Sequence, residues 1–111
     1  MLFDIAAADP DGVALDDLTR TRSWGELLDR ATRIAHFLRD GLRLGPDDHV
    51  ALLMGNRVEF VELIFGAMFA GVWITPINWH LKEAEAAYVV ENSGSRALFT
   101  DEEHADSARR L

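Results

Sequence analysis

The sequence of 111 residues predicts an α/β protein in which βαβ crossovers build a parallel sheet, preceded by a short β-hairpin. Short apolar runs at His49–Met54, Gly71–Ile77 and Arg96–Thr100 alternate with segments of helical character. That alternation is typical of parallel strands joined by right-handed crossover connections. The runs are continuously apolar, as expected for strands that helices cover on both faces.

The first elements are a hairpin and a long helix. Weak alternation around a polar centre predicts that Val13–Asp16 pairs with Arg20–Ser23. Ser23 and Glu26 have the spacing of a capping box, so a helix should begin at Trp24 and end near Gly41. Its buried face is expected to hold the apolar residues that recur every three or four positions: Trp24, Leu27, Leu28, Ala31, Ile34, Ala35 and Leu38.

One aromatic residue of this helix does not fit the apolar face. Phe37 lies off the stripe, beside the charged face, and we expect another surface to cover it.

The later helices follow the three apolar runs in turn. Asn56 and Glu59 predict a second capping box, which opens a helix from about Arg57 to Ala70. The helix after Lys82 should stop at Gly94, because glycine adopts the left-handed conformation that ends helices. Thr100 and Glu103 predict the cap of a last, short helix.

The helix from Val58 to Ala70 is apolar around most of its circumference. At 100° per residue, only Glu59, Glu62 and Gly66 share one narrow polar sector. Three short strands and their helices can hardly surround such a helix, so we expect apolar surface to face water in the isolated chain. The sequence therefore resembles part of a larger domain, or one half of an obligate assembly, and self-association is expected.

Composition excludes several classes of function. The net charge is −8, from 11 basic and 19 acidic residues, and no basic stripe is available for nucleic acid. Cysteine is absent, which excludes disulfides and thiolate chemistry and agrees with a cytoplasmic location. The N-terminal residues lack the basic region of a signal peptide, and the apolar run Leu63–Ile77 is shorter than the roughly 20 residues of a membrane span.

The motifs in the sequence predict no catalytic, cofactor-binding or metal-binding residue. Neither a Walker loop nor a dinucleotide-binding glycine motif is present. Gly55 and Asn56 lie at a strand-to-helix turn that could hold an anion, but an ordinary capped helix is the preferred interpretation. The histidines do not have metal-ligand spacing and are expected to be solvated or to lie in turns: His36, His49, His80 and His104.

Four phrases in a fixed order carry a family resemblance: Ser23–Leu27 (SWGEL), Gly45–Ala51 (GPDDHVA), Met54–Phe60 (MGNRVEF) and Gly71–Asn78 (GVWITPIN). From about Gly12 onward the chain resembles the N-terminal subdomain of acyl-CoA synthetases of the adenylate-forming, AMP-binding superfamily. Residues 1–111 would then be part of that subdomain, with the remainder of the enzyme as partner.

The resemblance implies a ligase that uses ATP, Mg²⁺ and coenzyme A to convert a carboxylic acid, here of fatty-acid type, into its thioester. In that family the phosphate loop and the catalytic lysine lie beyond the region seen here, so the isolated chain should be inactive. Two alternatives remain: a stand-alone, non-catalytic α/β binding or assembly module, and a peripheral membrane protein that uses the Phe-rich helix.

Overall fold

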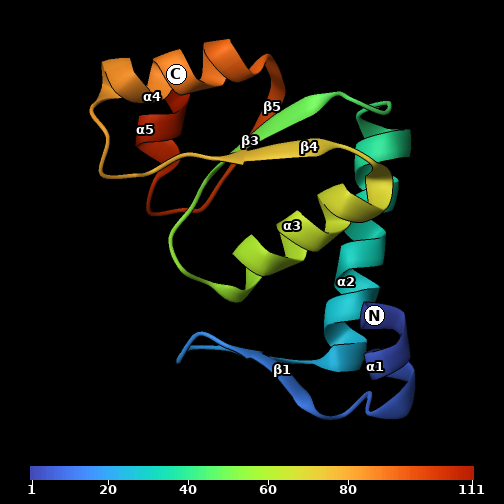
Figure 1. The fold of residues 1–111 in the computed structure, drawn as a ribbon. Coiled ribbons are helices and arrows are strands. Elements are labelled where there is room, and N and C mark those ends of the chain that lie inside the picture. Colours follow the sequence, from blue (N-terminus) through green and yellow to red (C-terminus); the bar gives the residue numbers. More distant parts are fainter.

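The computed structural model describes residues 1–111 and has the predicted α/β architecture (Figure 1). Its central sheet has the strand order β4-β3-β5, and β3 runs parallel to both neighbours. The strands are β3 (His49–Leu53), β4 (Trp73–Pro76) and β5 (Ser95–Thr100). The prediction of a parallel sheet with crossover connections is therefore confirmed.

Helices cover the two faces of this sheet (Figure 1). Because successive side chains of a strand point to opposite faces, Val50 packs into one apolar core and Ala51 into another. The first core includes residues of α2 (Trp24–His36) and α3 (Val58–Ala70), and the second lies under α4 (Glu83–Ser93) and α5 (Ala105–Arg109).

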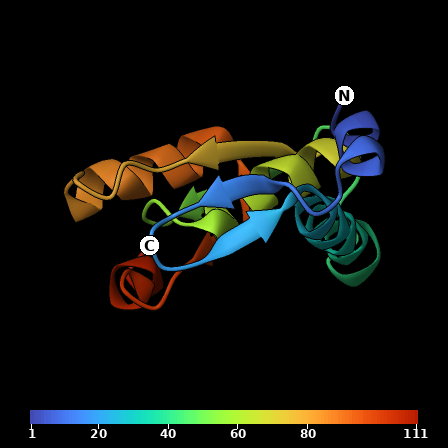
Figure 2. The ribbon, with the colours of Figure 1, turned by 90° about the horizontal axis from the view of Figure 1, so that it is seen from below.

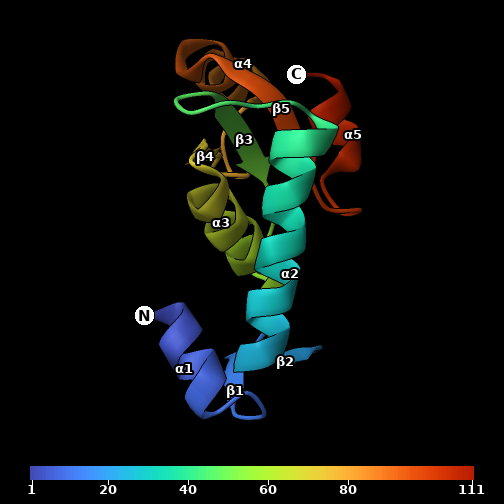
Figure 3. The same ribbon diagram turned by 90° about the vertical axis from the view of Figure 1, so that its right-hand side faces the viewer.

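The N-terminal elements lie at the end of α2 that is distant from α4 and α5 (Figure 3). They are α1 (Leu2–Ala8) and the antiparallel hairpin of β1 (Val13–Asp16) and β2 (Thr21–Ser23), whose strands run side by side in Figure 2. The predicted hairpin is confirmed.

The start of α2 is the predicted capping box. The Glu26 side chain accepts from the Ser23 N–H at 2.8 Å, and the Ser23 hydroxyl accepts from the Glu26 N–H at 3.1 Å. A turn of π-helix, η1 (Phe37–Gly41), continues α2 to the predicted end. Phe37 is 51% exposed, so about half of its side chain remains uncovered within these residues.

The predicted capping box of α3 is wrong. Arg57 precedes the first helical residue, and no side chain of this segment caps the helix. Instead, Asp17 in the hairpin accepts a hydrogen bond from the Val58 N–H at 2.9 Å. The N-terminus of α3 is thus capped by a carboxylate that is distant in sequence and not by Asn56 and Glu59, whose spacing predicted a capping box.

The predicted cap of the last helix is also wrong. β5 extends through Thr100, and α5 begins only at Ala105. The residue that caps this turn is Asp101, whose carboxylate accepts from the His104 N–H at 2.9 Å. Gly94, by contrast, ends α4 in the left-handed conformation as predicted, with φ of 68°.

The polar sector of α3 faces inward, against α2 and the hairpin. Glu62 is 1% exposed and accepts from Arg30 at 2.6 Å and from Arg22 at 3.1 Å. Gly66 lies so close to α2 that a Cβ there would stand 2.4 Å from Ile34 Cγ2. The two helices therefore meet through an ion-paired carboxylate and a glycine contact.

The apolar sector of α3 remains partly open, as the sequence predicts. Met68 is 64% exposed, and Phe3 of α1, which stacks on Phe69 at 5.3 Å, is 59% exposed. None of the helices combines the length and the apolar composition required to cross a bilayer.

Candidate functional site

The carboxyl ends of the three parallel strands meet at one edge of the sheet, where open α/β sheets place their ligand sites. Met54–Asn56 follows β3, Ile77–His80 follows β4 and Asp101–His104 follows β5. Among these turns the structure brings together Gly55, Asp101 and His104, since the Gly55 N–H donates to Asp101 at 2.9 Å.

A polar cleft of about 530 Å³ lies between this edge and the tip of the hairpin. No hydrophobic residue lines it; the lining residues are Asp17, Thr19, Arg20, Gly55, Asn56, Arg57, Asp101, Glu102 and Glu103. The two arginines are already paired with Glu59, Arg20 at 2.7 Å and Arg57 at 2.9 Å. The four carboxylates therefore dominate the field in the cleft.

Asp17 fixes the hairpin to this edge. Its carboxylate accepts from the N–H groups of Arg20 at 2.7 Å, Val58 at 2.9 Å and Thr19 at 3.0 Å. These bonds stabilise the ionised form, in that order of strength, and lower the pKa of Asp17 to about 2.

Asp101, directly after β5, likewise accepts hydrogen bonds from backbone N–H groups, and it is more buried than Asp17. Burial alone would raise the pKa of this carboxyl. The hydrogen bonds from Gly55 and from the ring and backbone of His104 outweigh that effect and hold the pKa of Asp101 below its usual range. The side chain is 2% exposed, so an ionised carboxylate is held at the floor of the cleft.

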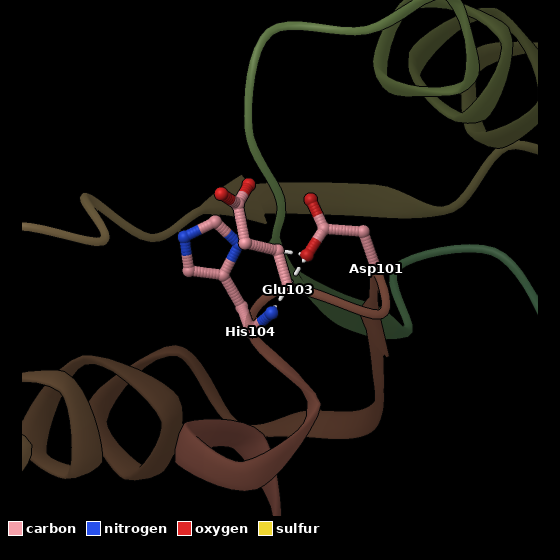
Figure 4. Close-up of side chains that lie close together, drawn as sticks. All are labelled: Asp101, Glu103 and His104. Atoms are coloured by element: carbon pink, nitrogen blue, oxygen red, sulfur yellow. Dashed lines mark hydrogen bonds and ion pairs between the residues drawn. The ribbon is translucent and has the colours of Figure 1, made fainter.

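The side chains of Asp101, Glu103 and His104 converge within this one turn (Figure 4). His104 Nδ1 lies 2.7 Å from Asp101 Oδ1, and one ligand atom from each of the three residues lies within 4.8 Å of the others. His104 lies in a turn, which is one of the two expected placements, and its side chain is 13% exposed. The histidines His36 and His80 are exposed, as expected.

Trp79 adds an aromatic surface beside the same edge. Its ring centroid lies 3.7 Å from that of His80 and 5.4 Å from that of His104.

The anion site considered at Gly55 is filled from within the chain, because the Gly55 N–H is bound to Asp101.

The roles of Asp17 and of the Asp101–His104 pair were not predicted from the sequence, for different reasons. Asp17 binds an N–H that is 41 residues away, and no local pattern announces such a contact. Asp101 did carry a signal: an acid directly after a strand, three residues before the N–H that it caps.

The sequence profile described as AMP-binding enzyme matches residues 2–111. The chain is 34% identical over 92 residues to a fatty acid–[acyl-carrier-protein] ligase of Streptomyces coeruleorubidus, which covers 83% of this chain and 18% of that protein. It is 36% identical over 98 residues to a medium/long-chain-fatty-acid–CoA/3-oxocholest-4-en-26-oate–CoA ligase of Mycolicibacterium smegmatis, which covers 87% of this chain and 17% of that protein. The chain thus spans under a fifth of the length of these relatives.

The fold gives the same assignment. A benzoate CoA ligase of Burkholderia xenovorans superposes with a TM-score of 0.92 at 28% identity, over 98% of this chain and 22% of that one. The match of the sequence profile across nearly all residues, together with this fold, shows that the chain belongs to the AMP-binding, adenylate-forming family that includes the acyl-CoA and fatty acid ligases.

Proposed function

We propose that residues 1–111 are part of the N-terminal subdomain of an ATP-dependent acyl-CoA synthetase, whose remainder is the natural partner of this chain. The observation that carries the proposal is the family match over residues 2–111. In the proposed reaction a carboxylate attacks the α-phosphorus of Mg²⁺-bound ATP and expels pyrophosphate. The thiol of coenzyme A then attacks the acyl-adenylate, loses its proton and releases AMP.

We further propose a fatty-acid-like substrate and a cytoplasmic location. The substrate class is supported by relatives named as fatty acid ligases from two genera, and the location by the absence of cysteine. These relatives are named for different acceptors, a carrier protein and coenzyme A. We propose coenzyme A as the acceptor of the acyl group, and a carrier protein is the alternative acceptor.

The isolated chain should not form an adenylate. Its polar cleft presents Asp17, Asp101, Glu102 and Glu103, which repel a triphosphate. The backbone N–H groups of Gly55 and Val58, which face this region, are occupied by carboxylates of the chain itself. The sequence contains no glycine-rich loop of the kind that binds phosphates in nucleotide sites.

The test begins with the protein as the cell makes it. An antibody raised against residues 1–111 is used to isolate the native species, whose intact mass is compared with the 12.4 kDa of this chain. We expect a several-fold larger protein that releases pyrophosphate from ATP and Mg²⁺ with dodecanoate and yields dodecanoyl-CoA. The purified chain of 111 residues should give no pyrophosphate under the same conditions.

Two results would contradict this proposal. A native species of 12.4 kDa would favour the stand-alone binding or assembly module. Adenylate formation by the purified 111-residue chain would overturn the expected inactivity.

A further inference from the structure

The turn after β5 carries an unusual concentration of metal-ligating groups. Within Asp101–His104, two carboxylates and one imidazole place a ligand atom each within 4.8 Å of one another. The set combines oxygen and nitrogen donors, so it differs from a simple patch of acidic residues. None of these groups has a role in the proposed synthetase reaction.

Two of the three groups are held in place before any ion arrives. Asp101 is 2% exposed and is fixed by the Gly55 N–H, while His104 is 13% exposed and is held in the turn by its backbone N–H, which donates to Asp101. Preorganised ligands lose little freedom when an ion binds. Glu103 is exposed and makes neither a hydrogen bond nor an ion pair, so its carboxylate is free to turn toward an ion.

Asp101 retains the capacity to bind an ion in addition to its hydrogen bonds. A carboxylate has about four acceptor positions, and Oδ2 accepts only from the Gly55 N–H among hydrogen bonds. Oδ1 accepts from the backbone and the ring of His104. An ion on Nδ1 takes the place of the ring's hydrogen bond to Asp101, and a proton displaced from Nδ1 goes to solvent while solvent supplies one to Nε2.

The surroundings favour a cation that can enter from solvent. Asp101 and Glu103 line the open cleft, from which water and ions reach their carboxylates, while His104 lines the neighbouring pocket beside Trp79. Arg57 Nη1, 3.9 Å from Asp101 Oδ2, is the competing cation, but its Nε is paired with Glu59. Glu102 adds a further negative charge at the same rim.

We propose that Asp101, Glu103 and His104 bind a divalent transition-metal ion of the Zn²⁺ or Ni²⁺ class. An imidazole nitrogen beside carboxylates suits these ions better than Mg²⁺ or Ca²⁺, which prefer oxygen ligands alone. The ion is held within the turn after β5, which the Gly55–Asp101 hydrogen bond already connects to the β3–α3 turn. This site replaces the expectation from the sequence that the chain has no metal ligands.

The test is a calorimetric titration of the tag-free chain with ZnCl₂ and NiCl₂. We expect saturable binding of one ion per chain, and at least tenfold weaker binding of MgCl₂. His104→Asn and Glu103→Gln should each weaken Zn²⁺ binding at least tenfold. His36→Asn is the matched control, because His36 is an exposed histidine on α2, and it should bind as the parent chain does.

Two further readouts separate a folded site from incidental binding. Ni²⁺ should quench the fluorescence of Trp79, whose ring lies 5.4 Å from that of His104, and Trp79→Phe should lose this quenching. Zn²⁺ should raise the Tm of the parent chain but not of His104→Asn, with circular dichroism confirming that the variant is folded. Lack of saturable Zn²⁺ binding, or equal binding by the parent and His104→Asn, would overturn the proposal. These measurements use no ATP or acid, so they are independent of the proposed synthetase activity.

Discussion

At the scale of single residues, two aspartates hold the edge of the sheet together by binding backbone N–H groups of other segments. Asp17 connects the hairpin to α3, and Asp101 connects the turn after β5 to the turn after β3. Both act as ionised acceptors, and their pKa values are lowered accordingly. Charged hydrogen-bond acceptors therefore connect distant segments at this edge, beside the apolar cluster around Leu53 and Ile77.

The pKa of Asp17 leads to a prediction about acid stability. The pKa of Asp17 in the folded protein, about 2, is below the ordinary aspartate value of 3.8, so the ionised carboxylate stabilises the fold above pH 3.8. That contribution is lost as the pH falls through the folded pKa. Asp17→Asn should lower the Tm at pH 7 and flatten the loss of stability between pH 3.8 and about 2, as measured by thermal unfolding across pH.

Asp11→Asn is the control for this experiment, because Asp11 is exposed and makes no hydrogen bond or ion pair. An acid-unfolding profile of Asp17→Asn that coincides with that of the parent would contradict the prediction.

At the scale of elements, the contact between α2 and α3 depends on the absence of a side chain at Gly66. A Cβ there would stand 2.4 Å from Ile34 Cγ2 and 3.2 Å from the Ala31 carbonyl oxygen. Neither atom lies at the end of a flexible side chain, so the helices must separate to admit it. Close packing of this kind tolerates added volume poorly.

Gly66→Ala should therefore destabilise the chain even though alanine favours helix. Overpacking costs about 1–3 kcal/mol, while alanine regains about 1 kcal/mol of helix propensity. An Ile34→Ala background removes the Cγ2 contact but keeps the Ile34 Cβ, which would stand 2.7 Å from the new Cβ, so the cost of Gly66→Ala should become smaller there without disappearing. Urea unfolding of the four chains of this double-mutant cycle measures the coupling, and additive effects would exclude the proposed contact.

The capping patterns show what local sequence determines and where it fails. Ser23 and Glu26 satisfy each other within one turn, and the predicted start of α2 is correct. Asn56 has the same spacing to Glu59, but Glu59 is taken by arginines and Asp17 supplies the cap. Strand runs, helix positions and the parallel sheet were thus predictable, whereas the contacts of the cleft depend on residues brought together from distant segments.

At the scale of the whole molecule, the unburied apolar surface is the dominant feature. Met68, Phe3, Phe37 and Trp73 are each at least half exposed, with values of 64%, 59%, 51% and 60%. The molecule is also thin, with extents of 45 × 33 × 20 Å, so its helices have little depth of protein to cover them. Such surface favours association with other protein.

We therefore propose that the isolated chain self-associates through exposed apolar side chains, including those of Met68 and Phe3. Light scattering of the purified chain should show species larger than 12.4 kDa that increase with concentration. Met68→Glu should reduce them, because a charge opposes burial of that face. Leu18→Glu is the matched control, since Leu18 is 97% exposed at the tip of the hairpin. A monomer at every concentration, or equal effects of the two substitutions, would contradict the prediction.

The strand order β4-β3-β5 also has a consequence for synthesis on the ribosome. The middle strand, His49–Leu53, emerges first, while both strands that flank it are still untranslated. Its backbone N–H and C=O groups have no strand partner until Trp73–Pro76 follows. During that interval the most apolar strand of the nascent chain is open on both sides, and unpaired strand edges are prone to aggregation. The helix α3, made immediately after β3, is the first element able to shield one face of it.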